Sequence, residues 1–310
     1  MELEKALQGL ILSKIAEGKS PHTINVYQYG ISKLAKFLDN PEIQNISNKD
    51  IQAFFVYLRQ ETQLSENSLI NVWRAIRVLF SWSEKELGTT RPDKDMPYPK
   101  APIKLVIPFT DNEIRRLISA CNYTCASITD NRKAFTMKRP TADRDKAIIL
   151  TLLDTGARVS ELARMTLQDL NLETGEIQIR PFQSGLKSKP RTVYIGKLSR
   201  STLWRFLAGK DKEIDDYIFT TSNDHPMNRT SVRQLLVRIG DKAEINNVYP
   251  HRFRHTFAIQ YLRNGGDIFT LQRILGHSSL EMVKRYLSIA KTDCETAHRK
   301  ASPVDNWKLK

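Results

Sequence analysis

The chain has 310 residues, a length that favours two domains over one compact core. It carries 48 Lys and Arg against 34 Asp and Glu, and this net charge of +14 favours a polyanionic partner, with nucleic acid ahead of an anionic membrane surface. The membrane is the weaker candidate because the sequence has no apolar run of about 18 residues and no separate basic amphipathic terminus.

Cysteine usage and the N-terminus predict a protein of the reducing cytoplasm. Cys121, Cys125 and Cys294 form no even framework for disulfides, and MELEKALQGL is acidic where a signal peptide is basic and then apolar. Cys121 and Cys125 lie four residues apart, but no second pair of Cys or His follows at the spacing of a zinc site. The sequence therefore predicts two core thiols rather than metal ligands.

Apolar residues recur every three or four positions in four runs, which predicts four short amphipathic helices within residues 1–88. Gly18 ends the first run, and Ser20-Pro21 begins the second as a cap followed by a first-turn proline. Asn40-Pro41 ends the second run, while Ser47 and Ser65 begin the third and the fourth. The apolar stripes consist of Leu3, Leu7, Leu10, Ile11, Ile24, Tyr27, Ile31, Leu34, Leu38, Ile51, Phe54, Phe55, Leu58, Leu69, Trp73, Ile76 and Phe80.

The helical periodicity stops over residues 89–109, where five prolines stiffen a segment rich in Lys and Asp. This composition predicts a linker between a helical domain of residues 1–88 and a second domain of residues 110–310. A capping box formed by Thr110 and Glu113 is expected to begin the second domain.

The second domain is predicted to be mainly α-helical with one small antiparallel β-sheet. Residues 122–141 are polar, basic and aperiodic, so we expect a surface loop there. Helical patterning follows and is interrupted at Gly156. Alternating apolar residues predict strands from Glu176 to Pro181 and from Arg191 to Ile195, joined as a hairpin. From Lys197 onward the pattern is again mostly helical.

Four short strings stand out in the second domain: TGARVSEL, SGLKSKPRTV in the hairpin turn, HRFRHTF, and LGHSS followed by Tyr286. Each string alone has an ordinary structural explanation. Arg158 could be a surface arginine, and His251 and Arg254 could be neighbouring polar residues on one helix face. His277 could be a helix cap, and Tyr286 could be a core aromatic.

Together the strings supply what attack on a phosphodiester requires: two permanent cations for the non-bridging oxygens, a proton acceptor, a proton donor and a nucleophile. Arg158 and Arg254 offer planar forks that match phosphate, and they can take the place of a metal ion electrostatically. A histidine near neutral pKa can transfer protons. A tyrosine, with an ordinary pKa of about 10, needs such cationic surroundings to act as a nucleophile.

The order and spacing of these strings resemble the tyrosine recombinases, also called phage-type integrases, which include the Xer-like resolvases. The most specific feature is His251-x-x-Arg254 followed by Gly276-His277 and by Tyr286 nine residues beyond that histidine. Similar strings cover nearly the whole chain: SPHTINVYQYGISKLAKFL, PFTDNEIRRLI and AHRKASPVDNW. The resemblance implies an N-terminal helical, SAM-like core-binding domain and a tyrosine-recombinase catalytic domain, which together form a clamp around DNA.

Matching positions in the family imply a role for each residue. Tyr286 corresponds to the nucleophile, and Arg158 and Arg254 correspond to the arginines that clamp the phosphate. His251 corresponds to the general acid/base, and His277 to a second residue that contacts the phosphate.

Two further residues of these strings have less specific roles. Glu161 matches an acidic position that supports the active site, although a helix-surface carboxylate paired with Arg164 remains an alternative. His255, directly after the second clamp arginine, is expected to be structural.

The catalytic lysine is where the chain departs from the family. That lysine usually lies three residues before the Lys of a K-x-R-x-V string, and this register gives Leu186 here. The turn is longer than usual, so Lys187 is the predicted catalytic lysine and Lys189 the alternative. Either could instead contact a DNA phosphate.

The resemblance implies strand cleavage through a 3′-phosphotyrosine, without metal or cofactor, and strand exchange through a Holliday junction. The implied assembly is a homotetramer on paired recombination sites in double-stranded DNA, with an accessory directionality factor in some systems. Two alternatives stay open: a catalytically silent DNA-binding regulator with a recombinase fold, and an enzyme like a type IB topoisomerase or telomere resolvase. The intact nucleophile and arginines disfavour the first, and the small N-terminal helical domain disfavours the second.

Overall fold

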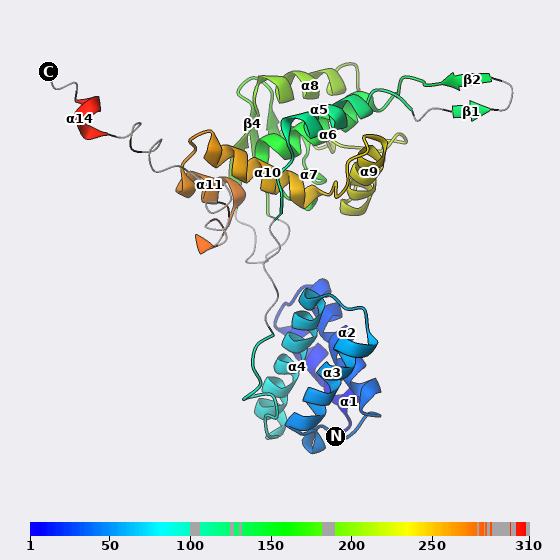
Figure 1. The fold of residues 1–310 in the computed structure, drawn as a ribbon, viewed down its shortest axis with the longest axis vertical. Coiled ribbons are helices and arrows are strands. Elements are labelled where there is room, and N and C mark those ends of the chain that lie inside the picture. The colour runs from blue at the N-terminus through cyan, green and yellow to red at the C-terminus, as the bar shows by residue number, and fades with distance from the viewer. Residues whose placement is uncertain are drawn as a thin grey trace. The chain divides into compact units, whose positions relative to one another are not determined.

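The computed structural model describes residues 1–99, 106–124, 127–129, 132–181, 190–277, 279–281, 283, 286, 298 and 302–307. The chain divides into two compact units, Met1–Leu105 and Val106–Lys310 (Figure 1). Each unit has a hydrophobic core of its own.

Three helices of the N-terminal unit begin at serine caps. The hydroxyls of Ser20 and Ser65 each accept a hydrogen bond from a backbone N–H three residues on, and Ser47 forms a capping box with Asp50. Gly88 ends the last helix in the left-handed conformation, with φ of 65°. The elements are α1 (Leu3–Ala16), α2 (Pro21–Phe37), a 3₁₀ turn (Ile43–Asn45), α3 (Asn48–Glu61) and α4 (Glu66–Leu87).

The predicted apolar stripes form the core of this unit. α2 packs against α1, α3 and α4, and α4 also packs against α1. Every stripe residue is buried except Ile11, Tyr27, Leu38 and Phe55, which are partly exposed. The helical pattern of residues 1–88 is therefore confirmed.

Residues 91–98 belong to the N-terminal unit and pack against α4. Asp93 is only 1% exposed and accepts hydrogen bonds from Arg77 of α4 and from Arg91. The ring of Tyr98 lies edge-on to Trp73, with ring centroids 4.7 Å apart. The first part of the proline-rich segment therefore lies along α4.

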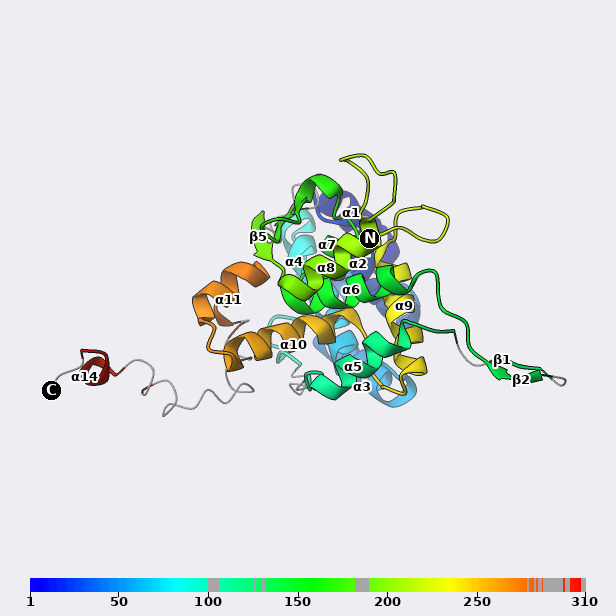
Figure 2. The same ribbon diagram turned by 90° about the horizontal axis from the view of Figure 1, so that it is seen from above.

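The C-terminal unit is built around α6, which lies between α8 and α10 in both views (Figures 1 and 2). The predicted capping box of Thr110 and Glu113 begins its first helix. In the part of the chain that the structure describes, no helix is long and apolar enough to cross a membrane. The helices are α5 (Asp111–Ala120), α6 (Ala142–Thr155), α7 (Val159–Leu162), a 3₁₀ turn (Leu167–Asp169), α8 (Lys197–Leu207), α9 (Arg229–Lys242), α10 (Pro250–Arg263), α11 (Ile268–Leu275) and α14 (Pro303–Asn306).

A three-stranded antiparallel sheet confirms the predicted hairpin and extends it. β4 (Glu176–Ile179) pairs with β5 (Arg191–Tyr194), and Ile177 lies opposite Val193, both buried. β3 (Leu170–Asn171) pairs with the other edge of β4. Two residues are too few to show an alternating pattern, which is why the sequence did not predict β3.

The prediction that residues 122–141 form a surface loop is wrong in one respect: the segment contains two strands. It contains a two-stranded antiparallel hairpin of β1 (Ser127–Thr129) and β2 (Arg132–Phe135), which projects from the unit (Figures 1 and 2). These strands have three and four residues, shorter than the alternation on which a strand prediction depends.

Cys121 ends α5 and is fully buried, as predicted for a core thiol. Burial, followed by the negative charge of Asp145, raises the pKa of this thiol to about 12. Cys125 and Cys294 lie outside the described residues.

Candidate active site

Arg158 is placed by a sharp break between two helices. α6 ends at Gly156, which adopts φ of 59°, and a Cβ there would lie 2.4 Å from the ring of Phe257. Only glycine satisfies both constraints. Arg158 then caps α7, with its side chain 33% exposed, so its guanidinium reaches the surface of the site.

Glu161 is a buried carboxylate that joins two arginines. Its side chain is 3% exposed and accepts hydrogen bonds from the backbone N–H of Arg158 at 2.8 Å and from the guanidinium of that residue at 3.0 Å. Arg191 of β5 donates to both carboxylate oxygens, at 3.0 and 2.8 Å. Burial alone would raise the pKa of Glu161, but hydrogen bonds and charge from Arg191, followed by Arg158, lower it to about 2. Glu161 is therefore an anionic support within the site and not a surface carboxylate.

Arg254 is the most deeply buried cation of the site, at 2% exposed. Its guanidinium donates to the carbonyl oxygens of Gly156 and Leu275, each at 2.6 Å. These carbonyls lie at the C-terminal ends of α6 and α11, where helices lack internal donors and favour positive charge. Burial, followed by repulsion from Arg158, lowers the pKa of Arg254 to about 10, so it stays charged at neutral pH.

The tautomer and the protonation state of His277 follow from its contact with Arg254. The guanidinium lies 2.8 Å from Nε2 of His277. Because a guanidinium only donates, Nε2 accepts and the ring proton of the neutral imidazole lies on Nδ1. Burial, followed by the charges of Arg254, Arg158 and Arg191, lowers the pKa of His277 to about 4. His277 is therefore neutral at pH 7 in this state.

Tyr286 lies among the histidines. It is 4% exposed, and its ring is nearly parallel to that of His277, with centroids 6.4 Å apart and an interplanar angle of 11°. His255 of α10 contacts it, with ring centroids 5.3 Å apart, and the ring of His255 in turn lies 4.7 Å from that of His251. Loss of solvent around the ring of His251, followed by the charges of Arg254 and Arg158, lowers its pKa.

The structure thus brings together six residues singled out from the sequence: Arg158, Glu161, His251, Arg254, His277 and Tyr286. Lys187 and Lys189 lie outside the described residues.

Sequence reasoning missed one contributor to the site and one contact within it. Arg191 stands in the KPRTV string beside the candidate lysines, and its pairing with Glu161 spans 30 residues of sequence. The missed contact is that of His255, expected to be structural, whose ring lies against those of both His251 and Tyr286. The signal that could have identified it is its position four residues after His251, which places both rings on one face of α10.

We expect the C-terminal unit to lose stability as the pH falls. Burial first, then neighbouring positive charge, lowers the pKa of His255 and of His277 from 6.5 to about 4. Between pH 6.5 and about 4 the unfolded chain therefore binds more protons than the folded chain. The contribution of the two neutral histidines to the free energy of unfolding is complete above pH 6.5 and is lost as the pH falls toward about 4. Calorimetry should record a falling melting temperature, with a shallower slope in a His255→Asn/His277→Asn variant. His22→Asn, at an exposed position of the other unit, is the control, and an unchanged slope in the double variant would contradict the assignment.

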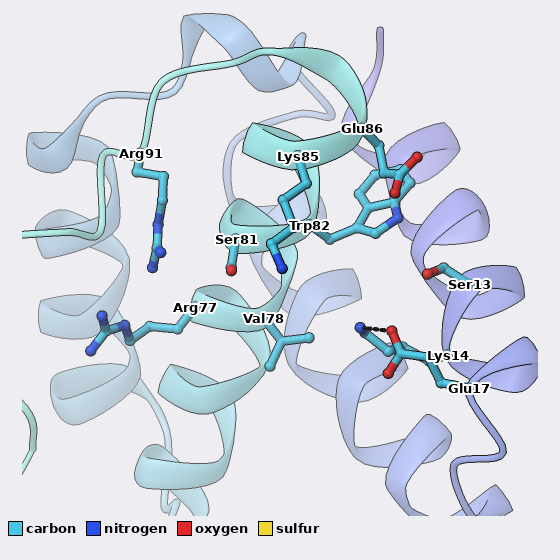
Figure 3. A pocket seen from close by; sticks show the side chains of 10 residues that line it. All are labelled: Ser13, Lys14, Glu17, Arg77, Val78, Ser81, Trp82, Lys85, Glu86 and Arg91. Carbon is cyan, nitrogen blue, oxygen red and sulfur yellow. Dashed lines mark hydrogen bonds and ion pairs between the residues drawn. The ribbon is translucent and has the colours of Figure 1, made fainter.

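Each of the two units has a hollow of its own. One, of about 1170 Å³, is lined by β5, α10 and α11 and reaches Arg191 and His277. The other, of about 500 Å³, lies between α1 and α4 in the N-terminal unit (Figure 3). Its cations are partly neutralised, because Lys14 pairs with Glu17 and two of its arginines pair with Asp93. It has no His or Tyr in its lining, so it is not the candidate active site.

Comparison with known proteins identifies the family. Residues 108–293 match the phage integrase family, and residues 7–89 match the N-terminal SAM-like domain of phage integrases. The chain belongs to the phage integrase family. It is 30% identical to tyrosine recombinase XerA of Thermococcus kodakarensis, over 93% of this chain and 92% of the relative. It is 27% identical to tyrosine recombinase XerC of Oceanobacillus iheyensis, over 94% of each chain.

The same fold occurs in a solved structure of the Tn1549 transposon integrase in complex with transposon right end DNA. The TM-score is 0.75 at 19% identity, over 97% of this chain and 99% of that chain. The resemblance to tyrosine recombinases is therefore confirmed, as is the mainly helical fold with a SAM-like N-terminal domain and a small antiparallel sheet. The chain is an enzyme of the tyrosine recombinase class.

Proposed function

We propose that this recombinase cuts and rejoins DNA strands at a specific site through a covalent bond between DNA and Tyr286. The observation that carries the proposal is the position of the Tyr286 ring against His277 and His255, in a site that also holds Arg158 and Arg254. A tyrosine hydroxyl becomes a nucleophile only where positive charge and a proton acceptor are close by.

The roles divide by charge and protonation. Arg158 and Arg254 neutralise the non-bridging oxygens of the scissile phosphate and stabilise the added charge of the transition state. Burial, followed by the charges of Arg254 and Arg158, lowers the pKa of His251, which favours the neutral ring that can accept the proton of Tyr286. His277 adds a contact to the phosphate, and Glu161 holds Arg158 in place.

In the proposed reaction, the hydroxyl oxygen of Tyr286 attacks the phosphorus while the bond from phosphorus to the 5′-oxygen breaks. Lys187 donates the proton that the leaving 5′-oxygen needs, with Lys189 as the alternative donor. The new ester bond from phosphorus to Tyr286 replaces the broken bond to the 5′-oxygen, so the number of phosphoester bonds is unchanged and the 5′-hydroxyl of a partner strand can reverse the reaction without nucleotide hydrolysis. Two rounds on a homotetramer would pass through a Holliday junction.

The net charge of +14 supports double-stranded DNA as the partner, and the similar Tn1549 integrase was solved in complex with DNA. We propose that residues 1–88 and 110–310 both bind the same duplex and that residues 89–109 link them. The cytoplasm is the proposed compartment, and an accessory directionality factor is a further proposed partner.

Covalent capture tests the proposal. A suicide DNA substrate, nicked beside the cleavage point so that the short product strand diffuses away, should leave protein bound to DNA on a denaturing gel. A site-specific recombinase forms this adduct only on its own site. DNA binding without any adduct would instead indicate a silent regulator, and adducts on arbitrary supercoiled DNA with relaxation would indicate topoisomerase-like activity.

We expect cleavage to survive chelation of divalent metals. Arg158 and Arg254 stand where metal-dependent nucleases hold cations, and an arginine cannot be removed by EDTA. The yield of adduct from the suicide substrate should be the same in EDTA and in magnesium at equal ionic strength. Loss of adduct in EDTA that magnesium restores would contradict the roles given to the two arginines.

A further inference from the structure

Arg191 is the most heavily bonded side chain of the site to which no role has been given. It is 7% exposed, and three nitrogens of its guanidinium each have a partner. Two donate to the oxygens of Glu161, and Nε donates to the carbonyl oxygen of Ile274 at 2.6 Å. One planar fork therefore joins β5 to α7 and to the end of α11.

The glycine before His277 shows how closely Arg191 approaches this end of α11. Gly276 adopts φ of 63°, and a Cβ at this position would lie 3.2 Å from Cδ and from a terminal nitrogen of Arg191. The guanidinium thus packs against the backbone of the residue that precedes His277. A shift of Arg191 would move this backbone or leave the carbonyl of Ile274 without its donor.

The charges of the site give Arg191 a second effect. Glu161 is anionic and lies 3.0 Å from the guanidinium of Arg158, so these two groups alone have no net charge. Arg191 restores one positive charge to the group. Without it, the carboxylate would compete with the DNA phosphate for Arg158.

We propose that Arg191 is a positioning residue for strand cleavage, which neutralises Glu161 and ties it to the end of α11 so that Arg158 remains available to the scissile phosphate. This inference rests on the proposed function. In this role Arg191 acts through Glu161 and the carbonyl of Ile274, to which three of its five N–H donors are bonded.

The test compares an ordinary scissile phosphate with a methylphosphonate, in which a methyl group replaces a charged non-bridging oxygen. The neutral linkage no longer needs the full cationic clamp. Arg191→Met keeps the aliphatic volume and removes the charge. Relative to wild type, its single-turnover cleavage at saturating DNA should fall about 10- to 100-fold on phosphate. On methylphosphonate it should fall by no more than about 3-fold.

The comparison of two substrates separates positioning from a structural role. Both rates come from one preparation, so a reduced fraction of folded protein lowers them equally and cancels in their ratio. An equal loss on both substrates, or no loss on either, overturns the inference. Arg180→Met is the matched control, because Arg180 follows β4 in the same sheet, is exposed and pairs with Asp169 away from the site. It should match wild type on both substrates.

A second variant keeps the test valid if Arg191→Met does not fold. Arg191→Lys retains the charge but cannot bind both Glu161 oxygens and the Ile274 carbonyl at once. It should show a smaller loss that is again larger on phosphate than on methylphosphonate, and equal losses would overturn the inference. Failure of the proposed function has a different signature, since the wild type itself would then form no adduct on the phosphate substrate.

Discussion

Replacing Tyr286 by Phe should abolish covalent capture of DNA while leaving DNA affinity near that of the wild type. The substitution removes only the attacking oxygen. The ring can keep its contacts with His255 and His277, and the arginines that bind the phosphate remain. Loss of a catalytic nucleophile typically lowers the rate by about 10⁴-fold or more. The adduct on a suicide substrate should therefore fall below detection, while a gel-shift titration gives an unchanged dissociation constant.

Tyr261→Phe provides the matched control. Tyr261 lies on α10 and packs against the same apolar cluster as Tyr286, but its ring contacts Phe257 rather than the histidines. This variant should form the adduct at the wild-type rate. An adduct in Tyr286→Phe at the wild-type level would contradict the assignment, and peptide mapping of the adduct would then reveal the true nucleophile.

The second large effect is expected at the hairpin lysine. The leaving 5′-oxygen needs a proton, and we propose that a lysine between β4 and β5 donates it. Lys187 follows Gly185 within this turn, whereas Lys189 directly precedes Pro190 at the edge of the strand. Lys187→Ala should therefore slow cleavage about 10²- to 10⁴-fold, the usual contribution of general-acid catalysis. Lys189→Ala should mainly weaken DNA binding, with a shallower dependence on salt.

A sulfur substitution decides between the two lysines. A substrate with sulfur in place of the bridging 5′-oxygen has a leaving group that needs no proton. It should restore cleavage by Lys187→Ala and leave the rate of Lys189→Ala unchanged relative to wild type. Rescue of Lys189→Ala alone would show that Lys189 is the acid.

Local sequence patterns predicted the helices and singled out most of the reactive side chains. Caps such as Ser47 with Asp50 and Thr110 with Glu113 begin helices because the hydrogen bonds involved span only three residues. Apolar stripes with a period near 3.6 then bury one face of each helix. The glycine at position 156 interrupts a helical pattern and thereby exposes the next arginine, so Arg158 could be singled out from sequence alone.

Tertiary structure decided which polar groups act on one another. Arg254 bonds to Gly156 and Leu275, which lie 98 and 21 residues away, and Arg191 bonds to Glu161 at a distance of 30 residues. No local pattern predicts such pairs. A buried charge must be paired, and its partner is whichever group lies nearby once the helices have packed, at any spacing along the chain. The sequence by itself therefore determined that this chain is a tyrosine recombinase and which side chains are candidates for its chemistry. Packing decided that Glu161 is buried between Arg158 and Arg191, and that His277 lies against the guanidinium of Arg254.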